Sequence, residues 1–297
     1  MVKTLLLIGL TVLVFPVLAG PFSVTDDAGV QHQLQQPAQR IVSLMPHATE
    51  LLFEVGAGAQ IVGAVEYSDY PEAAKRIPRV GGYSGLNIEA IVALQPDLIL
   101  AWPEGNNQRE LQRLQQLGMT LFVSDPDTFD DIALNLERLG LLSGHPQQGN
   151  QAAVAFRRKV AELRRQYSQQ RPVLSVFYQV WHQPLLTQNG STFISHAIEL
   201  CGGRNIFAAL PMAAPQVSIE SVLAADPEVI VASGMGASRP EWLDAWRRYP
   251  QLSAVKTGSL YHIHPDLFHR PTPRFLTGTG ILCRDMQQTR ERMSAND

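Results

Sequence analysis

The sequence predicts an α/β protein of two Rossmann-like lobes, each with a parallel sheet, joined by a single long α-helix and holding a ligand cleft between them. Three observations support this fold class. The chain has 297 residues, more than one hydrophobic core usually organises. Short apolar segments of strand character alternate with helical patterns in both halves, which is typical of parallel sheets with right-handed crossovers. A segment of the first half is also repeated in the second half.

The repeat lies at residues 87–100 and 218–231, and its two copies match in character along their length. Each copy begins with a residue that favours a helix N-cap, Asn87 or Ser218. A two-turn amphipathic helix, a Pro-acid turn and a short buried strand follow. We therefore expect the two lobes to be built alike.

Strands and helices flank each copy in the same order. We expect further strands at residues 41–44, 62–65, 121–123, 173–177 and 260–263. We expect further helices at residues 49–55, 111–117, 193–200 and 242–249. These elements place the N-terminal lobe at residues 20–127 and the C-terminal lobe at residues 171–297.

The segment between the lobes is residues 128–170, and no strand signal is found from Asp130 to Gln169. Phe156, Val160, Leu163 and Tyr167 recur at helical spacing, and four arginines lie on the opposite face. We expect one long solvated helix that links the lobes and restrains their relative motion. A nucleic-acid patch is the alternative for the arginines, but a solvated helix face explains them more simply.

Composition excludes several classes of protein. Hydrophobic residues make up 45% of the chain and charged residues 17%, so intrinsic disorder is excluded. Glycine and proline follow no period, which excludes collagen-like and low-complexity chains. The net charge of −3 leaves no basic footprint, and we expect no nucleic-acid partner.

Residues 1–19 have the pattern of a secretory signal peptide. Lys3 precedes a short apolar run at residues 5–14, and the segment ends at Ala19. The run is shorter than the roughly 20 residues that span a bilayer. We expect cleavage after Ala19 and an exported, soluble protein; an uncleaved anchor is the alternative.

The chain has two cysteines, Cys201 and Cys283. In an exported protein an even number of cysteines favours a disulfide, since thiols oxidise outside the cytoplasm. We therefore predict one Cys201–Cys283 disulfide. Two buried free thiols are the alternative.

No catalytic motif has its required context. The glycine pairs at residues 56–58 and 278–280 do not leave a strand and open a helix, and the Lys-Thr-Gly at residues 256–258 lacks a Ser-x-x-Lys partner. His262, His264 and His269 lie close in sequence, but the spacing of a known metal motif is missing. We predict no catalytic residue, no metal site and no cofactor; a hydrolase or metal-dependent enzyme is the remote alternative.

Candidate ligand-binding residues lie on loops at strand ends, where α/β lobes bind ligands. The first half places Tyr67, Tyr83 and Trp102 on such loops. The candidates in the second half are Trp181, Leu186, Asp266, Phe268 and Arg270. The aromatic rings predict a flat apolar ligand, with Asp266 and Arg270 near its polar groups. Packing within the fold is the alternative for each ring taken alone.

A family resemblance is carried by motifs at residues 67–71, 87–98, 101–106, 199–207, 215–218 and 273–274. Through these motifs, residues 40–283 resemble the helical-backbone substrate-binding proteins of ABC importers, and within that group the branch that binds vitamin B12. It implies a monomeric periplasmic protein that captures cobalamin or a related corrinoid as its transported ligand. The partner that it implies is a dimeric membrane permease with its ATPase subunits. A haem or ferric-siderophore receptor of the same architecture is the alternative, with an axial histidine from residues 262–269 in the haem case.

The chain departs from this branch at four positions. Tyr83 stands where a tryptophan is usual, and Leu186, Ala214 and Leu267 stand where aromatic residues are expected. The departures predict an aromatic wall in the first lobe and a thinner wall in the second.

Glu89 and Glu220 occupy equivalent places in the two repeats, two residues after each N-cap. A carboxylate in the first turn of a helix is stabilised by the helix dipole, which is the simple explanation for either residue alone. Their equivalence, together with the family resemblance, implies that both dock on arginines of a twofold-symmetric permease.

Overall fold

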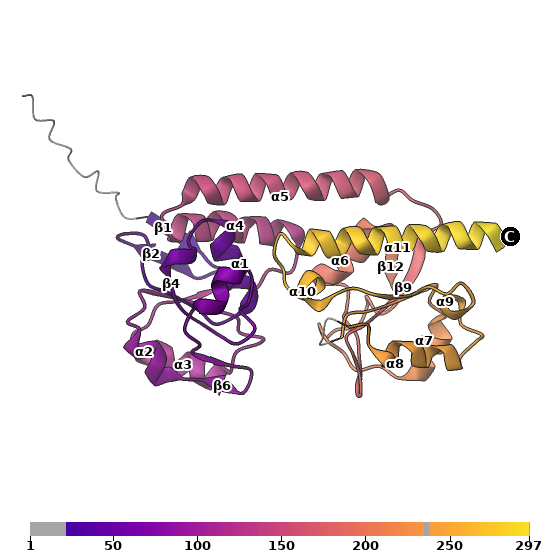
Figure 1. Ribbon diagram of the computed structural model, residues 1–297, viewed down its shortest axis with the longest axis horizontal. Helices are drawn as coiled ribbons and strands as arrows, with labels where there is room; N and C mark the ends of the chain where they lie inside the picture. Colours follow the sequence, from indigo (N-terminus) through magenta and orange to yellow (C-terminus); the bar gives the residue numbers. More distant parts are fainter. Residues whose placement is uncertain (1–21, 235–237, 297) are drawn as a thin grey trace, which may run out of the picture.

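The computed structural model describes residues 22–234 and 238–296 and contains two α/β lobes (Figure 1). The predicted signal peptide lies outside the described residues. The sheet of the first lobe has the strand order β4 (Ile61–Ala64), β3 (Ile41–Ser43), β7 (Leu98–Ala101), β8 (Leu121–Val123). That of the second lobe has the order β12 (Gly203–Asn205), β9 (Leu174–Gln179), β13 (Val229–Ala232), β14 (Leu260–His262). Neighbouring strands are parallel in both sheets, which confirms the predicted fold class.

Helices cover the sheets of both lobes. In the first lobe they are α1 (Pro46–Glu54), α2 (Ile88–Ala93), α3 (Gln108–Gln116) and α4 (Phe129–Leu142). In the second lobe they are α6 (Phe193–Leu200), α7 (Ile219–Ala225), α8 (Glu241–Asp244), α9 (Ser253–Lys256), α10 (Pro265–Phe268) and α11 (Phe275–Asn296). Short 3₁₀ turns lie at Gly58–Gln60, Glu72–Arg76 and Ala245–Arg248. Within the described parts of the chain, every helix is too short or too polar to cross a membrane.

Three antiparallel strand pairs complete the secondary structure. They are β1 (Phe22–Thr25) with β2 (Gln31–Leu34), β5 (Gly81–Gly82) with β6 (Gly85–Leu86), and β10 (Trp181–His182) with β11 (Leu185–Leu186). The last two pairs carry residues that the sequence predicted to bind ligand.

The long helix α5 (Pro146–Tyr167) runs across both lobes, along the top in Figure 1. The predicted helical link is therefore present, but residues 128–170 hold two helices and not one. The chain breaks after α4, where Gly144 has φ +79° and Pro146 opens α5. Helix α4 then packs on α1 and β1 of the first lobe. A Cβ on Gly149 would lie 2.6 Å from the carbonyl oxygen of Leu136, so glycine is what lets α4 and α5 approach this closely.

One apolar core continues through both lobes beneath α4, α5 and α11. It joins the strands β3 and β9 to these helices. The ring of Phe129 in α4 lies 5.7 Å from that of Phe275 in α11 and 6.4 Å from that of Phe156 in α5. Smaller apolar clusters cover the other face of each sheet. The lobes are thus packed together over a shared core, and α5 is more than a tether between them.

The internal repeat is reproduced element by element. Asn87 and Ser218 cap α2 and α7 by accepting hydrogen bonds from Ala90 N–H and Ser221 N–H. The turns that follow place Gln95 and Asp226, at the same position of the repeat, in the left-handed region with φ of +46° and +40°.

The acid of each Pro-acid turn is bound to the central strand of its own sheet. Asp97 accepts hydrogen bonds from Gln39 N–H at 2.7 Å and Arg40 N–H at 3.0 Å, just before β3. Glu228 accepts one from Ser175 N–H in β9 at 2.6 Å. The acid is therefore repeated because it fixes where the repeat strand pairs with the central strand.

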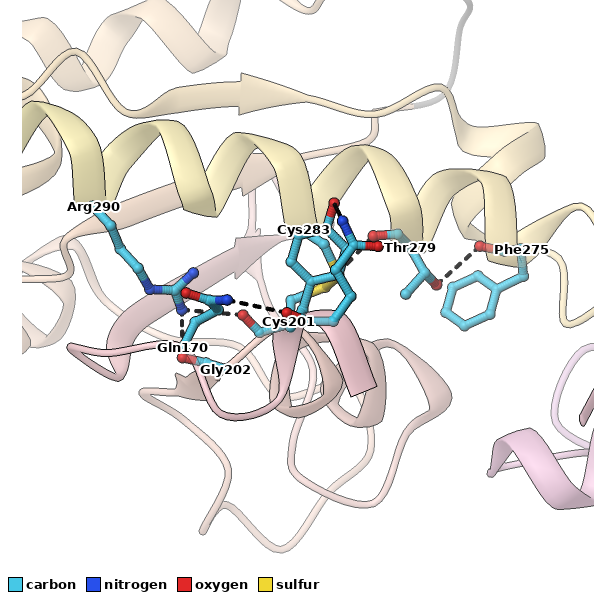
Figure 2. The surroundings of a disulfide bond; sticks show 9 residues. Gln170, Cys201, Gly202, Phe275, Thr279, Cys283 and Arg290 are labelled. Atoms are coloured by element: carbon cyan, nitrogen blue, oxygen red, sulfur yellow. Dashed lines mark hydrogen bonds between the residues drawn. A yellow bond between two sulfur atoms is a disulfide. The ribbon is translucent and has the colours of Figure 1, made fainter. Parts of the chain in front are cut away.

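The predicted disulfide is present and links α6 to α11 (Figure 2). Cys201 ends α6 and Cys283 lies in α11, with 4.7 Å between their Cα atoms and both side chains fully buried. Arg290 of α11 donates hydrogen bonds to the carbonyl oxygens of Cys201 at 3.1 Å and Gly202 at 2.8 Å. The end of α6 is therefore held both covalently and by a guanidinium group that satisfies its last carbonyls.

Replacing both cysteines by alanine should lower the free energy of unfolding by roughly 4–5 kcal/mol, because the disulfide closes a loop of 82 residues in the unfolded chain. Urea unfolding measures this loss, and the reduced wild-type protein is the matched control. Mass spectrometry of the exported protein should find two hydrogens fewer than in the dithiol. Equal stability of the oxidised wild type and the double variant would contradict the prediction.

Candidate functional site

The loops that leave the carboxyl ends of the two parallel sheets meet where the lobes join. In the first lobe Asp69 lies on the loop after β4. In the second lobe Arg270 follows β14 and α10. The Arg270 guanidinium lies 3.0 Å from the carboxylate of Asp69, so the structure brings together the two sheet edges on which we predicted the ligand to bind.

Tyr67 and Tyr83 present their rings to solvent. Their exposed fractions are 70% and 98%. The backbone of Tyr67 has φ +63°, which is uncommon for any residue other than glycine. Tyr83 lies in the turn between β5 and β6. Two large exposed aromatic residues on loops of one lobe are available for a ligand and contribute little to the packing of the core.

Trp102 is half-buried at the carboxyl end of β7 and is held from several sides. Its Nε1–H donates to Oδ1 of Asp125 at 2.8 Å, and the His47 ring meets it edge-on with centroids 5.9 Å apart. A Cβ on Gly105 would lie 2.1 Å from the Trp102 ring, so glycine is required for the indole to lie on this loop. Trp102 was predicted from the sequence, but Asp125 was not, because it is separated from Trp102 by 23 positions.

Trp181 and Leu186 lie opposite each other in the β10–β11 hairpin of the second lobe, and both are partly exposed. Next to Trp181, the His182 ring stacks on Trp242 with centroids 5.4 Å apart and an interplanar angle of 11°. His182 and Trp242 were not among the residues predicted from the sequence. The adjacency of His182 to Trp181 was the one available signal, because Trp242 comes from a helix 60 positions further on. These two rings extend the aromatic surface beside Trp181.

Phe268 is a correction to the predicted ligand contacts. Its side chain is fully buried, and its ring lies 5.7 Å from Tyr178 and 5.3 Å from Phe275. The short helix α10 turns this ring inward, into the core that both lobes share. Phe268 therefore supports the fold and is removed from the candidate site.

Arg270 and Asp266, predicted near the polar groups of a ligand, form an ion pair with each other at 3.0 Å. Arg270 also contacts Glu50 of α1 at 2.9 Å, in the first lobe. Arg274 and Thr272 donate to the same Glu50 carboxylate at 3.1 and 3.0 Å. The second lobe thus surrounds one carboxylate of the first with three donors.

The Glu50 side chain is only 3% exposed, which makes it the centre of this inter-lobe cluster. The pKa of Glu50 is raised: burial is the largest cause, and the nearby Arg270 and Arg274 guanidinium groups offset it only in part. Arg274 also lies over the ring of Tyr70, 3.9 Å from its centroid. Glu50 was not predicted from the sequence, because a single acid within a helical pattern carries no signal of its distant partners.

The three histidines near the C-terminus have separate partners. His269 shares a hydrogen bond of 2.7 Å with the Tyr178 hydroxyl, and burial lowers the pKa of His269 to about 4. His262 bonds to the Ser233 carbonyl, and His264 caps α10. Among residues 22–234 and 238–296 there is no group of three or more His, Cys, Asp or Glu side chains placed to hold a metal ion.

Glu89 and Glu220 lie at the starts of α2 and α7, as predicted from the repeat. Glu220 is exposed, and hydrogen bonds from its own backbone N–H and from Ser218 lower its pKa. Glu89 borders a surface hollow of about 510 Å³ between α2 and α3. The hollow is lined by Ile88, Glu89, Val92, Ala93, Arg113 and Leu117.

Comparisons with known proteins place the chain among relatives of this architecture. The family model for periplasmic binding proteins matches residues 41–267. The vitamin B12-binding protein of Yersinia pestis (strain Pestoides F) is 43% identical over 251 residues, covering 84% of this chain and 87% of that protein. The crystal structure of the periplasmic vitamin B12-binding protein of Vibrio cholerae has 41% identity and a TM-score of 0.77, covering 86% of this chain and 98% of that one.

A periplasmic haem-binding protein of Roseiflexus sp. RS-1 also matches, with a TM-score of 0.74 over 85% of this chain and 99% of that one. Its identity is 23%, so this likeness concerns the fold alone.

The inter-lobe cluster predicts unequal effects for its two first-lobe acids. Glu50→Ala should lower the free energy of unfolding by about 3–5 kcal/mol, because two guanidinium groups lose a buried partner. Asp69→Ala is the matched control and should cost about 1 kcal/mol or less, since the Asp69 side chain is 43% exposed. Urea unfolding at neutral pH measures both. Equal losses in the two variants would contradict the central role of Glu50.

Proposed function

The chain belongs to the periplasmic binding protein family, and we propose that it captures cobalamin or a related corrinoid in the periplasm and delivers it to an ABC importer of the inner membrane. The observation that carries this proposal is the set of aromatic side chains on strand-end loops, in a chain 41% identical to the vitamin B12-binding protein of Vibrio cholerae. Tyr67, Tyr83 and Trp102 supply rings from the first lobe, and Trp181 supplies one from the second.

A corrinoid is a broad, flat and largely apolar ring with amide side chains at its edge. Exposed aromatic rings bury their faces against such a surface, which contributes area and about 0.5–1.5 kcal/mol of stacking per ring. Leu186 adds apolar surface in the second lobe. The Asp266 carboxylate can accept hydrogen bonds from the amide groups, and the Arg270 guanidinium can donate to them. The ion pair between Asp266 and Arg270 keeps both side chains in place.

In this proposal the two lobes keep a nearly constant relative orientation. The core shared by α4, α5 and α11 and the cluster around Glu50 both resist a hinge opening. A preorganised site loses less conformational entropy on binding than one that must close around its ligand. Binding in this family requires no bond making, and we propose no catalytic residue and no cofactor for this chain.

The histidines at residues 262–269 give less support to haem as the ligand. Either ring nitrogen of a histidine could bind haem iron, and Nε2 already has a hydrogen-bond partner in two of the three histidines at residues 262–269: the Ser233 carbonyl for His262 and the Tyr178 hydroxyl for His269. His264 uses Nδ1 to accept from Asp266 N–H. A corrinoid already carries its own metal ligands and needs none from the protein.

We further propose that Glu89 and Glu220 dock on a dimeric permease, which works with its ATPase subunits. The two carboxylates lie at equivalent points of the two repeats, and a twofold-symmetric partner presents the same basic site twice. The protein itself acts as a monomer in this scheme, exported through its N-terminal signal peptide.

Isothermal titration with cyanocobalamin tests the ligand. The wild-type protein should release or absorb heat and show tryptophan quenching, and Trp102→Ala should weaken binding by about tenfold. Haemin, titrated in parallel, should bind more weakly. If cyanocobalamin gives neither heat nor quenching at high micromolar concentration, the corrinoid proposal fails.

A double variant, Glu89→Ala with Glu220→Ala, tests the docking proposal in vesicles that contain the permease and its ATPase. Cyanocobalamin affinity should be unchanged, while stimulation of transport should be lost. The matched control is Glu72→Ala with Glu162→Ala, which removes two exposed carboxylates from other surfaces. Normal transport by the first pair would leave these glutamates with a helix-dipole role only.

A further inference from the structure

The indole of Trp102 is oriented by an acid from a different strand-end loop. An indole has a single N–H donor, and that of Trp102 donates a hydrogen bond to Oδ1 of Asp125 at 2.8 Å. Asp125 follows β8, whereas Trp102 follows β7, so the bond joins two neighbouring loops at the carboxyl edge of the first sheet. The two loops therefore share one fixed geometry at the proposed ligand wall.

Asp125 is itself held in place by the β1–β2 turn. Its backbone N–H donates to Oδ2 of Asp27 at 2.7 Å. Asp27 accepts a further hydrogen bond from Asn135 at 2.8 Å and forms an ion pair with Arg138, both in α4. The chain of contacts runs from α4 through Asp27 to Asp125 and ends on the Trp102 ring. A carboxylate anchored in this way can define the ring plane of its partner.

We propose that Asp125 is a positioning residue for ligand binding: it sets the plane of the Trp102 ring so that the face of the indole is presented to the ligand. The inference rests on the proposed function, since Trp102 is taken as part of the ligand wall. The backbone of Trp102 is fixed independently, because Asn106 accepts from its N–H at 2.8 Å. Losing the Asp125 acceptor would therefore remove the hydrogen bond that orients the indole without moving the strand, and leave the ring to its packing contacts with His47 and Gly105.

The surroundings of Asp125 make this bond sensitive to pH. The pKa of Asp125 is raised to about 6. Burial is the largest cause of this shift, the charge of Glu104 is the next, and other neighbouring acids add to it. Trp102 opposes the shift by donating its hydrogen bond to the charged form. The titratable and charged side chains beside Asp125 and Trp102 are Asp27, His47, Glu104 and Asp127; Arg138 pairs with Asp27, and Asp131 and His196 act on Asp127.

The sign of the effect follows from the ionised form of Asp125. Above its pKa the carboxylate accepts a charge-assisted hydrogen bond, which is stronger than a neutral one. Below its pKa the protonated acid is a weaker acceptor, and the indole is held less firmly. The orientation of Trp102, and with it the affinity for a flat ligand, should therefore decline as the pH falls through about 6.

The Trp102 ring can be observed directly, without ligand, through the indole N–H signal of ¹⁵N-labelled protein. The chain has 4 tryptophans, and Trp102→Phe assigns the signal by its loss. In the wild type the signal should shift between about pH 5 and pH 8 with a midpoint near 6. In Asp125→Asn the amide oxygen still accepts the bond but does not titrate, so the signal should stay constant. In Asp127→Asn the bond remains and one negative neighbour is removed, so the midpoint should move to lower pH.

Cyanocobalamin titrations give the second measurement. At pH 7.5 Asp125→Asn should bind within about twofold of the wild type, and Asp125→Ala should bind roughly fivefold more weakly, as expected for one lost hydrogen bond. The wild type should lose affinity towards pH 5, and Asp125→Asn should not. A Trp102 signal that does not change with pH in the wild type, or a titration that persists in Asp125→Asn, overturns the proposal. If the wild type binds no cyanocobalamin, the proposed function fails and the indole signal alone decides the role of Asp125.

Discussion

The directional contacts between the two lobes are centred on one buried carboxylate, that of Glu50. It lies in the first helix of the N-terminal lobe, and donors of the C-terminal lobe, Arg270, Arg274 and Thr272, converge on it. A charge this deeply buried is stable only when its partners are in place. The apolar core that the lobes share provides the area, and the Glu50 cluster provides the directional contacts that select one arrangement.

The same cluster links the fold to the proposed site. Arg270 reaches Glu50 and Asp69 on one side and Asp266 on the other, so the residues that would meet the polar edge of a ligand also connect the lobes. A ligand that bonds to Asp266 or Arg270 adds contacts to an existing network, which is consistent with a preorganised site. In the first lobe Trp102 is positioned in a comparable way, by an acid that is anchored elsewhere.

The internal repeat explains why the lobes are alike in their scaffold and different in their surfaces. The N-caps, the left-handed turn residues and the acids that bind the central strands recur because the same strand pairing has to be formed twice. The loops at the carboxyl ends are free of that constraint. The first lobe carries Tyr67, Tyr83 and Trp102 there, whereas the second uses the β10–β11 hairpin and the stack of His182 on Trp242.

The sequence by itself determined the fold class, most strands and helices, the repeat and the disulfide. Each of these depends on information that is local or countable: hydrophobic periodicity, capping residues, and two cysteines in a chain predicted to be exported. The tertiary structure alone decided the break between α4 and α5, the inward turn of Phe268, and the partners of Glu50, Arg270 and Asp125. A residue type states which bonds a side chain can make, but its partner depends on which distant segments the packed core brings within about 3 Å.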